Sequence, residues 1–289
     1  MPDELDTGDH DAGAPWSGEL REHLVRDGVV RVRSLLDETW CERLHRAIER
    51  CRHRPGPFYG VLSADGSPVV DSDLFRWSDD PTIAELTHAS PIVACASALI
   101  GEPDVVLIED QWFASAPGAV TASPWHQDEP YYRLDRPFLT IWVTLDDVAA
   151  DASLRVVAGS HVSGSLFAPV EFSATGSTLV DHETDRLEPV PDVDADPTRY
   201  PVLSWDLRAG DAVCIDSRTL HATGVSAVPD RQYRRVSTRW AAPDTRYRTR
   251  ATPTALFWDE LSHGLEPGDP IAGDVFPSVS ARRDVRRRD

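Results

Sequence analysis

The chain has 289 residues and a formal net charge of −19, because 48 Asp and Glu residues outnumber 29 Lys and Arg residues. A field of that sign repels phosphate backbones and anionic lipid surfaces, so the composition argues against nucleic acid and membrane partners. Hydrophobic residues make up 41% of the chain and include nine Trp, so wholesale disorder is excluded and one domain with decorations is expected.

The N-terminal part is predicted to be helical. Residues 1–15 are rich in Asp, Gly and Pro and lack the pattern of a signal peptide, so a flexible leader is expected there. Apolar spacing predicts helices over residues 17–26, 37–54 and 81–99, with an extended run at Val29–Val32 after the first. We expect a single domain over residues 16–280, followed by a frayed basic tail at residues 281–289.

From Val105 the pattern changes to short extended runs separated by turn residues. These runs are Val105–Ile108, Leu139–Leu145, Leu154–Val157, Ala212–Ile215 and Val236–Trp240. Such spacing is typical of a sandwich or barrel, so the fold is predicted to be mainly β with flanking N-terminal helices. The long polar stretch Ser173–Pro201 is expected to lie over the mouth of the barrel.

The cysteines and the hydropathy bear on localisation. Cys41, Cys51, Cys95 and Cys214 form no Cys-x-x-Cys pair, so neither a disulfide framework nor a structural zinc site is indicated. No apolar stretch is expected to approach the roughly 20 residues that span a bilayer. A reducing cytoplasm is therefore the expected compartment.

Two imidazoles and one carboxylate are spaced like ligands of a metal. Trp125 precedes the only His-x-Asp in the chain, His126 to Asp128, and residues two apart in an extended segment point to the same face. A second histidine, His221, ends a strand that follows the turn at Gly210. Two His and one carboxylate form a facial triad that leaves three positions of an iron open, although one His-x-Asp is also expected by chance.

The sequence resembles the phytanoyl-CoA dioxygenase family of non-haem iron oxygenases. The resemblance spans roughly residues 105–247. Its segments, in the family's order, are Asp110-Gln-Trp-Phe113, Trp125-His-Gln-Asp-Glu-Pro-Tyr-Tyr132, Ile141-Trp-Val-Thr-Leu-Asp146, Gly159-Ser-His161, Gly210-Asp211, Leu220-His221 and Arg235-Val-Ser-Thr-Arg-Trp240. The resemblance implies a double-stranded β-helix core of the cupin-like, jelly-roll kind, with Fe(II), 2-oxoglutarate and O2 as cofactor and cosubstrates.

The resemblance also implies residues that hold 2-oxoglutarate. In the family an Arg after the distal His grips the far carboxylate, but here that position falls on Tyr233, with one extra residue before Trp240. Regular alternation favours Arg235 with the hydroxyl of Ser237, and Arg234 is the second choice. Two further cosubstrate contacts are expected by match to family positions, and they are Gln111 and Tyr132.

Substrate contacts come from variable loops and are harder to infer. The aromatic residues expected as pocket walls are Tyr59, Phe75, Trp77, Trp112 and Trp205. His161 and Trp142 are expected to be structural, in a corner and in the core respectively.

The leading hypothesis is hydroxylation or other oxidative tailoring of a small organic metabolite, which is expected to be a bacterial natural product, with succinate and CO2 as coproducts. Asp128 argues against halogenation, because halogenating relatives carry a small residue there. The same oxidant used for ring closure, desaturation or epimerisation stays open, because substrate placement decides among these outcomes. From a different class, a redox-silent cupin-like isomerase or binding module also stays open.

Overall fold

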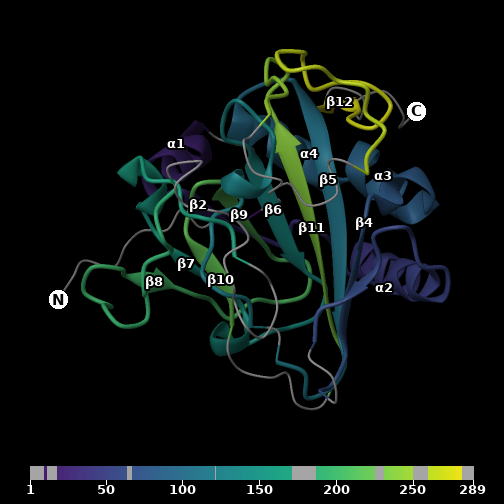
Figure 1. Cartoon of the computed structure of the whole chain (residues 1–289). Coiled ribbons are helices and arrows are strands. Elements are labelled where there is room, and N and C mark those ends of the chain that lie inside the picture. Colours follow the sequence, from purple (N-terminus) through teal and green to yellow (C-terminus); the bar gives the residue numbers. More distant parts are fainter. Residues whose placement is uncertain are drawn as a thin grey trace.

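The structure is a computed structural model that describes residues 10–11, 18–63, 67–120, 122–170, 187–224, 231–249 and 260–281. Within these residues a nine-stranded sheet and a three-stranded sheet face each other. The large sheet has the order β1-β2-β9-β6-β11-β5-β4-β3, with β12 paired to β5, and the small sheet has the order β10-β7-β8. The helices and the small sheet lie on opposite sides of the large sheet (Figure 1).

The strands of the large sheet are β1 (His10–Asp11), β2 (Val29–Arg33), β3 (Gly60–Val61), β4 (Val70–Leu74), β5 (Asp104–Ser115), β6 (Leu139–Thr144), β9 (Ala212–Asp216), β11 (Tyr233–Ala241) and β12 (Ser278–Ser280). The small sheet contains β7 (Leu154–Val157), β8 (Val202–Leu203) and β10 (His221–Thr223). All five extended runs expected from the sequence after Val105 are confirmed as strands. The fold is the mainly β jelly roll that was expected.

The helices are α1 (Gly18–Asp27), α2 (Glu38–His53), α3 (Pro81–Ala89) and α4 (Pro91–Ile100). The single helix predicted over residues 81–99 is wrong, because Ser90 ends α3 and begins α4. Ser90 has an extended backbone, its side chain accepts a hydrogen bond from Ile92 N, and Pro91 fits the first turn of the second helix. Short 3-10 helices occur at η1 (Arg76–Ser78), η2 (Glu129–Tyr131), η3 (Ala150–Ala152) and η4 (Ser160–Ser163).

Residues 81–100 are also long and apolar enough to cross a membrane, with a mean hydropathy of 1.5, which the expectation from the sequence overlooked. They are interrupted at Ser90, and they place Ile83, Leu86, Ile92 and Leu99 in the core beneath the large sheet. We therefore describe α3 and α4 as core helices of this domain.

One face of the large sheet packs on the helices. Alternate residues such as Trp112, Ile141, Val236 and Trp240 point to that face and join the core formed with α1 to α4. The intervening residues point to the interior between the two sheets, because successive strand side chains alternate. Several of the candidate functional residues lie on this second, interior face.

Described segments near both termini pack against the rest of the domain. Part of the expected leader, His10–Asp11, pairs in parallel with β2, so it is not wholly free of structure; the rest of residues 1–15 lies outside the described residues. At the other end, residues 260–281 cover the top of the barrel in Figure 1, where Ile271 and Phe276 pack with Tyr132 and Phe138. Residues 282–289 of the expected tail and residues 173–186 of the polar stretch Ser173–Pro201 lie outside the described residues.

Candidate metal centre

The two candidate imidazoles are placed opposite each other by a backbone bridge. His126 N donates to His221 O at 3.0 Å, and His221 N donates to His126 O at 2.9 Å. His221 opens β10, which pairs with β7 of the small sheet. Paired residues of antiparallel strands send their side chains to the same side. The ring centroids accordingly lie 4.1 Å apart.

Backbone carbonyls orient both rings. His126 Nδ1 lies 2.8 Å from Pro124 O, and His221 Nδ1 lies 2.9 Å from Thr219 O. A carbonyl only accepts, so each Nδ1 carries the proton and each Nε2 presents a lone pair. This arrangement is the one that metal-binding histidines use to fix the tautomer and the ring plane.

Asp128 completes the group because the chain turns sharply at this residue. Asp128 has a helical backbone and begins η2, so the extended geometry expected for His-x-Asp ends there. Gln127, between the two ligand candidates, points elsewhere and binds the backbone of Phe167 and Arg218. These contacts hold the segment in place while His126 and Asp128 converge.

The three side chains can hold one metal ion. Asp128 Oδ1 lies 3.7 Å from His126 Nε2 and 3.6 Å from His221 Nε2, and one ligand atom from each residue lies within 4.8 Å of the others. All three residues are buried. Two imidazoles and a carboxylate form the donor set of the facial triad that suits Fe(II), and the orienting carbonyls complete the fit.

The charges of the site also favour metal binding. Burial, reinforced by the neighbouring His221, lowers the pKa of His126 to about 3, and burial lowers the pKa of His221. Burial opposes ionisation of Asp128, but Arg239 and the two imidazoles outweigh it and hold the pKa of Asp128 below its usual range. At neutral pH the site therefore offers two neutral imidazoles and an ionised carboxylate.

Because both imidazole pKa values are lowered, the neutral forms persist to lower pH than in an ordinary imidazole, and protons compete with a metal only as the pH nears the folded-state values. We expect the Co(II) affinity of the metal-free protein to fall less than about threefold between pH 7 and pH 5.5. Two imidazoles of ordinary pKa would lose roughly fifty- to a hundredfold over that range. A Co(II) titration followed by absorbance measures the difference, and a loss of the larger size would contradict the lowered values.

A second group of side chains lies on the interior face of the large sheet. Along β11, Arg235, Ser237 and Arg239 share this face, and they pair across β5 with Phe113, Gln111 and Glu109 in turn. Gln111 Oε1 lies 3.5 Å from Arg239 NH1, and Tyr132 donates to Glu109 at 3.0 Å. The structure thus brings Arg235, Ser237, Gln111 and Tyr132 to the same interior face.

Arg235 is a buried cation without an anionic partner among the described residues. Its guanidinium donates to Ser115 Oγ at 3.2 Å and lies over the rings of Phe113 and Tyr233, at 4.6 Å and 5.3 Å from their centroids. Only 3% of the residue is exposed, and burial lowers its pKa. A buried charge costs free energy unless it is paired, so this guanidinium suits a bound carboxylate.

The sequence comparison decides the family. The model of the phytanoyl-CoA dioxygenase (PhyH) family matches residues 24–232, which is most of the chain. The chain belongs to the phytanoyl-CoA dioxygenase family. Its members are non-haem iron, 2-oxoglutarate-dependent oxygenases, so the resemblance read from the motifs is confirmed. A comparison with curated proteins gave no significant match.

Solved structures share the fold of this family member. The 2-oxoglutarate-dependent carbocyclase SnoK from nogalamycin biosynthesis is 23% identical, with a TM-score of 0.73 over 94% of this chain and 100% of its own. The epimerase SnoN, in complex with Fe3+, 2-oxoglutarate and nogalamycin RO, is 23% identical, with a TM-score of 0.69 over 90% and 97%. EvdO2 from Micromonospora carbonacea var. aurantiaca, complexed with 2-oxoglutarate, is 21% identical, with a TM-score of 0.55 over 81% and 94%.

Some expected site residues lie elsewhere in this phytanoyl-CoA dioxygenase relative. Arg234 points away from Arg235, and its Nε lies 3.7 Å from Asp146 Oδ2, so it does not reach the interior face. Trp112 is buried in the core on the helix side of β5, and Tyr59 packs there beside it and donates to Asp71. The structure therefore does not bring these three residues to the interior face: strand alternation turns Arg234 and Trp112 to the opposite face, and Tyr59, just before β3, packs on Trp112 there.

The remaining aromatic candidates divide between two places. Phe75 and Trp77 line a pocket beyond the end of β4, and Trp77 also packs against the core and His88. Trp205 lies at the margin of the interior cluster formed by Trp142 and Tyr233, with Arg31 6.0 Å from its ring centroid. His161 is buried with Nε2 2.9 Å from Val25 O, apart from the metal candidates, as expected for a structural corner.

Sequence reasoning missed three residues that contact Asp128 or its neighbours. Thr140 donates to Asp128 Oδ2 at 2.7 Å, Arg239 Nε lies 3.4 Å from the same oxygen, and Arg239 NH1 lies 2.6 Å from Glu109 Oε1. The available signal was a charged residue within an apolar strand, Glu109, together with Arg239 on the same face as Arg235.

Proposed function

We propose that this chain is an Fe(II)- and 2-oxoglutarate-dependent oxygenase, with His126, Asp128 and His221 as iron ligands. The observation that carries the proposal is the convergence of two oriented imidazoles and one carboxylate in a buried site, in a member of an iron oxygenase family. Bound Fe(II), with 2-oxoglutarate and O2, supplies an oxidant for an unactivated carbon and releases succinate and CO2. The chain's own residues hold, orient and enclose the reactants.

Arg235 is the proposed partner of the far carboxylate of 2-oxoglutarate. It lies four residues along β11 from Arg239, which contacts Asp128, so about 13 Å separate the two Cα atoms. The side chains of Arg235 and Arg239, together with a 2-oxoglutarate molecule between Arg235 and the metal, can fill that distance. The buried hydroxyl of Ser237 lies between them, and the amide of Gln111 faces it across the β5 and β11 pair. Tyr132 closes the side of the site next to Glu109.

We propose a small organic metabolite, of the natural-product kind, as the substrate. Proteins of the same fold include a carbocyclase and an epimerase from an antibiotic pathway, so hydroxylation, ring closure and epimerisation are all chemistries this fold accommodates. We place the protein in the cytoplasm, and its four free, buried cysteines suit that compartment.

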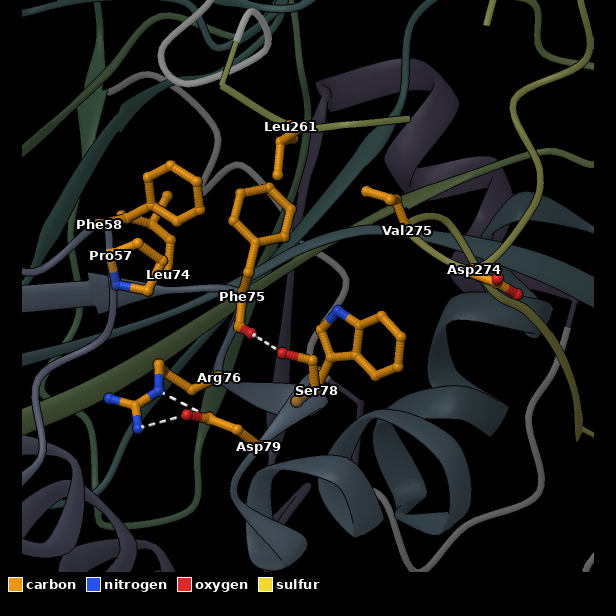
Figure 2. Close-up of a pocket in the computed structure, with 11 residues that line it drawn as sticks. Pro57, Phe58, Leu74, Phe75, Arg76, Ser78, Asp79, Leu261, Asp274 and Val275 are labelled. Atoms are coloured by element: carbon orange, nitrogen blue, oxygen red, sulfur yellow. Dashed lines mark hydrogen bonds and ion pairs between the residues drawn. The ribbon is translucent and has the colours of Figure 1, made fainter. Parts of the chain in front are cut away.

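The substrate is proposed to enter by a pocket of about 220 Å³ beside β4. Its apolar lining comprises Pro57, Phe58, Leu74, Phe75, Trp77, Leu261 and Val275, and its polar rim comprises Arg76, Ser78, Asp79 and Asp274. The rings of Phe58 and Phe75 meet edge to face at 5.4 Å, with Leu261 above Phe75 in Figure 2. What supports this route is that Leu74 pairs with Gln111 of β5, whose amide oxygen lies 3.5 Å from Arg239 NH1.

The wall at Phe75 is rigid. Its backbone is left-handed, with φ at 57°, a conformation that costs on the order of 1–3 kcal/mol in a residue with a side chain. Three hydrogen bonds hold it, because Phe75 N donates to Asp110 O, and the amides of Arg76 and Trp77 donate to the Asp110 carboxylate. Strain held in this way is typical of binding sites.

Phe58→Ala tests the pocket. Loss of a ring that buries against substrate costs about 1.5–3 kcal/mol, so we expect the substrate KM to rise roughly ten- to a hundredfold. The Kd for 2-oxoglutarate and its substrate-free turnover should stay unchanged, because Phe58 lines the pocket beside β4 whereas Arg235 contacts Ser115, Phe113 and Tyr233. Trp40→Ala, which removes a half-buried aromatic side chain on α2, is the matched control. An unchanged KM in Phe58→Ala would place the substrate elsewhere.

The activity itself is tested by anaerobic titration followed by exposure to O2. Fe(II) and 2-oxoglutarate together, but neither alone, should develop a weak visible charge-transfer band. Succinate release should then require Fe(II) and should accelerate when a library of small metabolites contains the substrate. Absence of the band, or succinate formation indifferent to iron, would instead favour a redox-silent cupin-like isomerase or binding module.

A further inference from the structure

Arg239 lies between two buried carboxylates at the candidate metal centre. Its NH1 lies 2.6 Å from Glu109 Oε1, and its Nε lies 3.4 Å from Asp128 Oδ2. The exposed fractions of the three side chains are 11%, 3% and 5% for Arg239, Glu109 and Asp128. One guanidinium therefore serves two carboxylates that water does not screen.

The two oxygens of Asp128 have different surroundings. Oδ2 accepts from Thr140 Oγ1 at 2.7 Å and from Arg239, whereas Oδ1 faces His126 Nε2 and His221 Nε2. Since Oδ2 is already engaged, only Oδ1 is free to bind a metal. A carboxylate without such partners can bind a metal through both oxygens and occupy one more of its positions.

Glu109 is the second carboxylate that contacts Arg239. It pairs with Arg239 across β5 and β11, and its Oε1 also accepts from Tyr132 at 3.0 Å. Burial raises the pKa of Glu109 although Arg239 and Tyr132 oppose that effect, so this carboxylate depends on a nearby cation for its charge. If the arginine were removed, Glu109 would lose this ion pair and would be a buried carboxylate beside the candidate metal centre.

We propose that Arg239 is a positioning residue that keeps Asp128 a one-oxygen ligand and holds Glu109 away from the metal. Both effects preserve the open positions that 2-oxoglutarate and O2 need. This inference rests on the proposed function of the site. A lysine could supply the charge of Arg239 but not the planar fork that reaches two carboxylates.

Arg239→Met, with Co(II) as the metal probe, tests the inference. The Kd for 2-oxoglutarate on the Co(II)-loaded protein should rise about ten- to a hundredfold, which matches the loss of metal affinity or activity when a group hydrogen-bonded to a metal ligand is removed. The Co(II) affinity itself should not fall, because a positive charge has left and a carboxylate has become available. A merely structural role would instead weaken Co(II) and 2-oxoglutarate together and lower the Tm.

Adding Glu109→Gln to Arg239→Met should restore at least about half of the lost 2-oxoglutarate binding on a logarithmic scale, because the competing ligand is then removed. Glu109→Gln alone should bind 2-oxoglutarate within about threefold of the wild type. If Arg239→Met does not fold, Arg239→Lys with and without Glu109→Gln carries the same comparison.

The outcomes separate the two proposals. A wild-type protein that binds neither Co(II) nor 2-oxoglutarate would overturn both the proposed function and this inference. Normal wild-type binding, together with an Arg239→Met variant that binds 2-oxoglutarate equally well or is not rescued by Glu109→Gln, would overturn the inference alone.

Discussion

Arg235→Met should raise the Kd for 2-oxoglutarate by about a hundredfold or more. Removal of one partner from a buried, charge-assisted pair costs 2–5 kcal/mol in comparable cases, which corresponds to roughly thirty- to several thousandfold. The Fe(II) or Co(II) affinity without 2-oxoglutarate should stay within about twofold, because the metal ligands are untouched. Titration of the anaerobic charge-transfer band, or calorimetry on the Co(II)-loaded protein, measures both constants.

The same variant should not destabilise the ligand-free protein greatly. Arg235 has no carboxylate partner among the described residues, and replacing a buried charge by an apolar side chain of similar length is often neutral or stabilising. We expect a free energy of unfolding within about 1 kcal/mol of the wild type. A wild-type 2-oxoglutarate Kd in Arg235→Met would show that another residue holds the cosubstrate.

Arg234→Met is the matched control. It is the same substitution one residue earlier, but its side chain lies on the other face, near Asp146. Its 2-oxoglutarate Kd should equal that of the wild type. The reverse pattern would be weaker 2-oxoglutarate binding in Arg234→Met and unchanged binding in Arg235→Met. It would mean that the register of β11 differs by one residue from the one described, because a shift by one residue exchanges the two faces of a strand.

The strands and the candidate ligands could be predicted because their signals are local. A period of two marks Leu139–Thr144 and Tyr233–Ala241 whatever they pair with, and the alternation that favoured Arg235 over Arg234 needs only the strand itself. The break at Ser90 was also readable, since Ser-Pro commonly begins a helix, but the continuous apolar run from Pro81 concealed it.

Tertiary packing decided the features that the sequence did not reveal. Whether Trp112 or Phe113 of β5 points to the interior depends on which face the helices cover, and a strand alone does not indicate that. The contact of Arg239 with Glu109 joins residues 130 positions apart, through a strand pairing that no local pattern specifies. The pocket at Phe75 requires the distant segment that contains Leu261.

Loss of one metal ligand should remove metal-dependent stabilisation altogether. A ligand that binds only the folded state at a hundred times its Kd adds about 2.7 kcal/mol of stability, and at this chain length that corresponds to a Tm rise of roughly 4–5 °C. We expect Co(II) or anaerobic Fe(II) to raise the Tm of the wild type by that amount and EDTA to reverse it. His126→Ala should show neither effect, and its charge-transfer band with 2-oxoglutarate should be absent.

His161→Ala controls for the loss of a buried imidazole. His161 is 4% exposed and His126 is 6% exposed, but the Nε2 of His161 is engaged by the backbone oxygen of Val25 rather than directed to Asp128. The control should therefore begin from a lower Tm yet keep the full rise on metal addition. If His126→Ala kept the metal-dependent rise in Tm while His161→Ala lost it, the iron would have to be assigned to a different set of ligands. The roles inferred for Arg239 and Arg235 would then be contradicted, because both assume a metal bound by His126, Asp128 and His221.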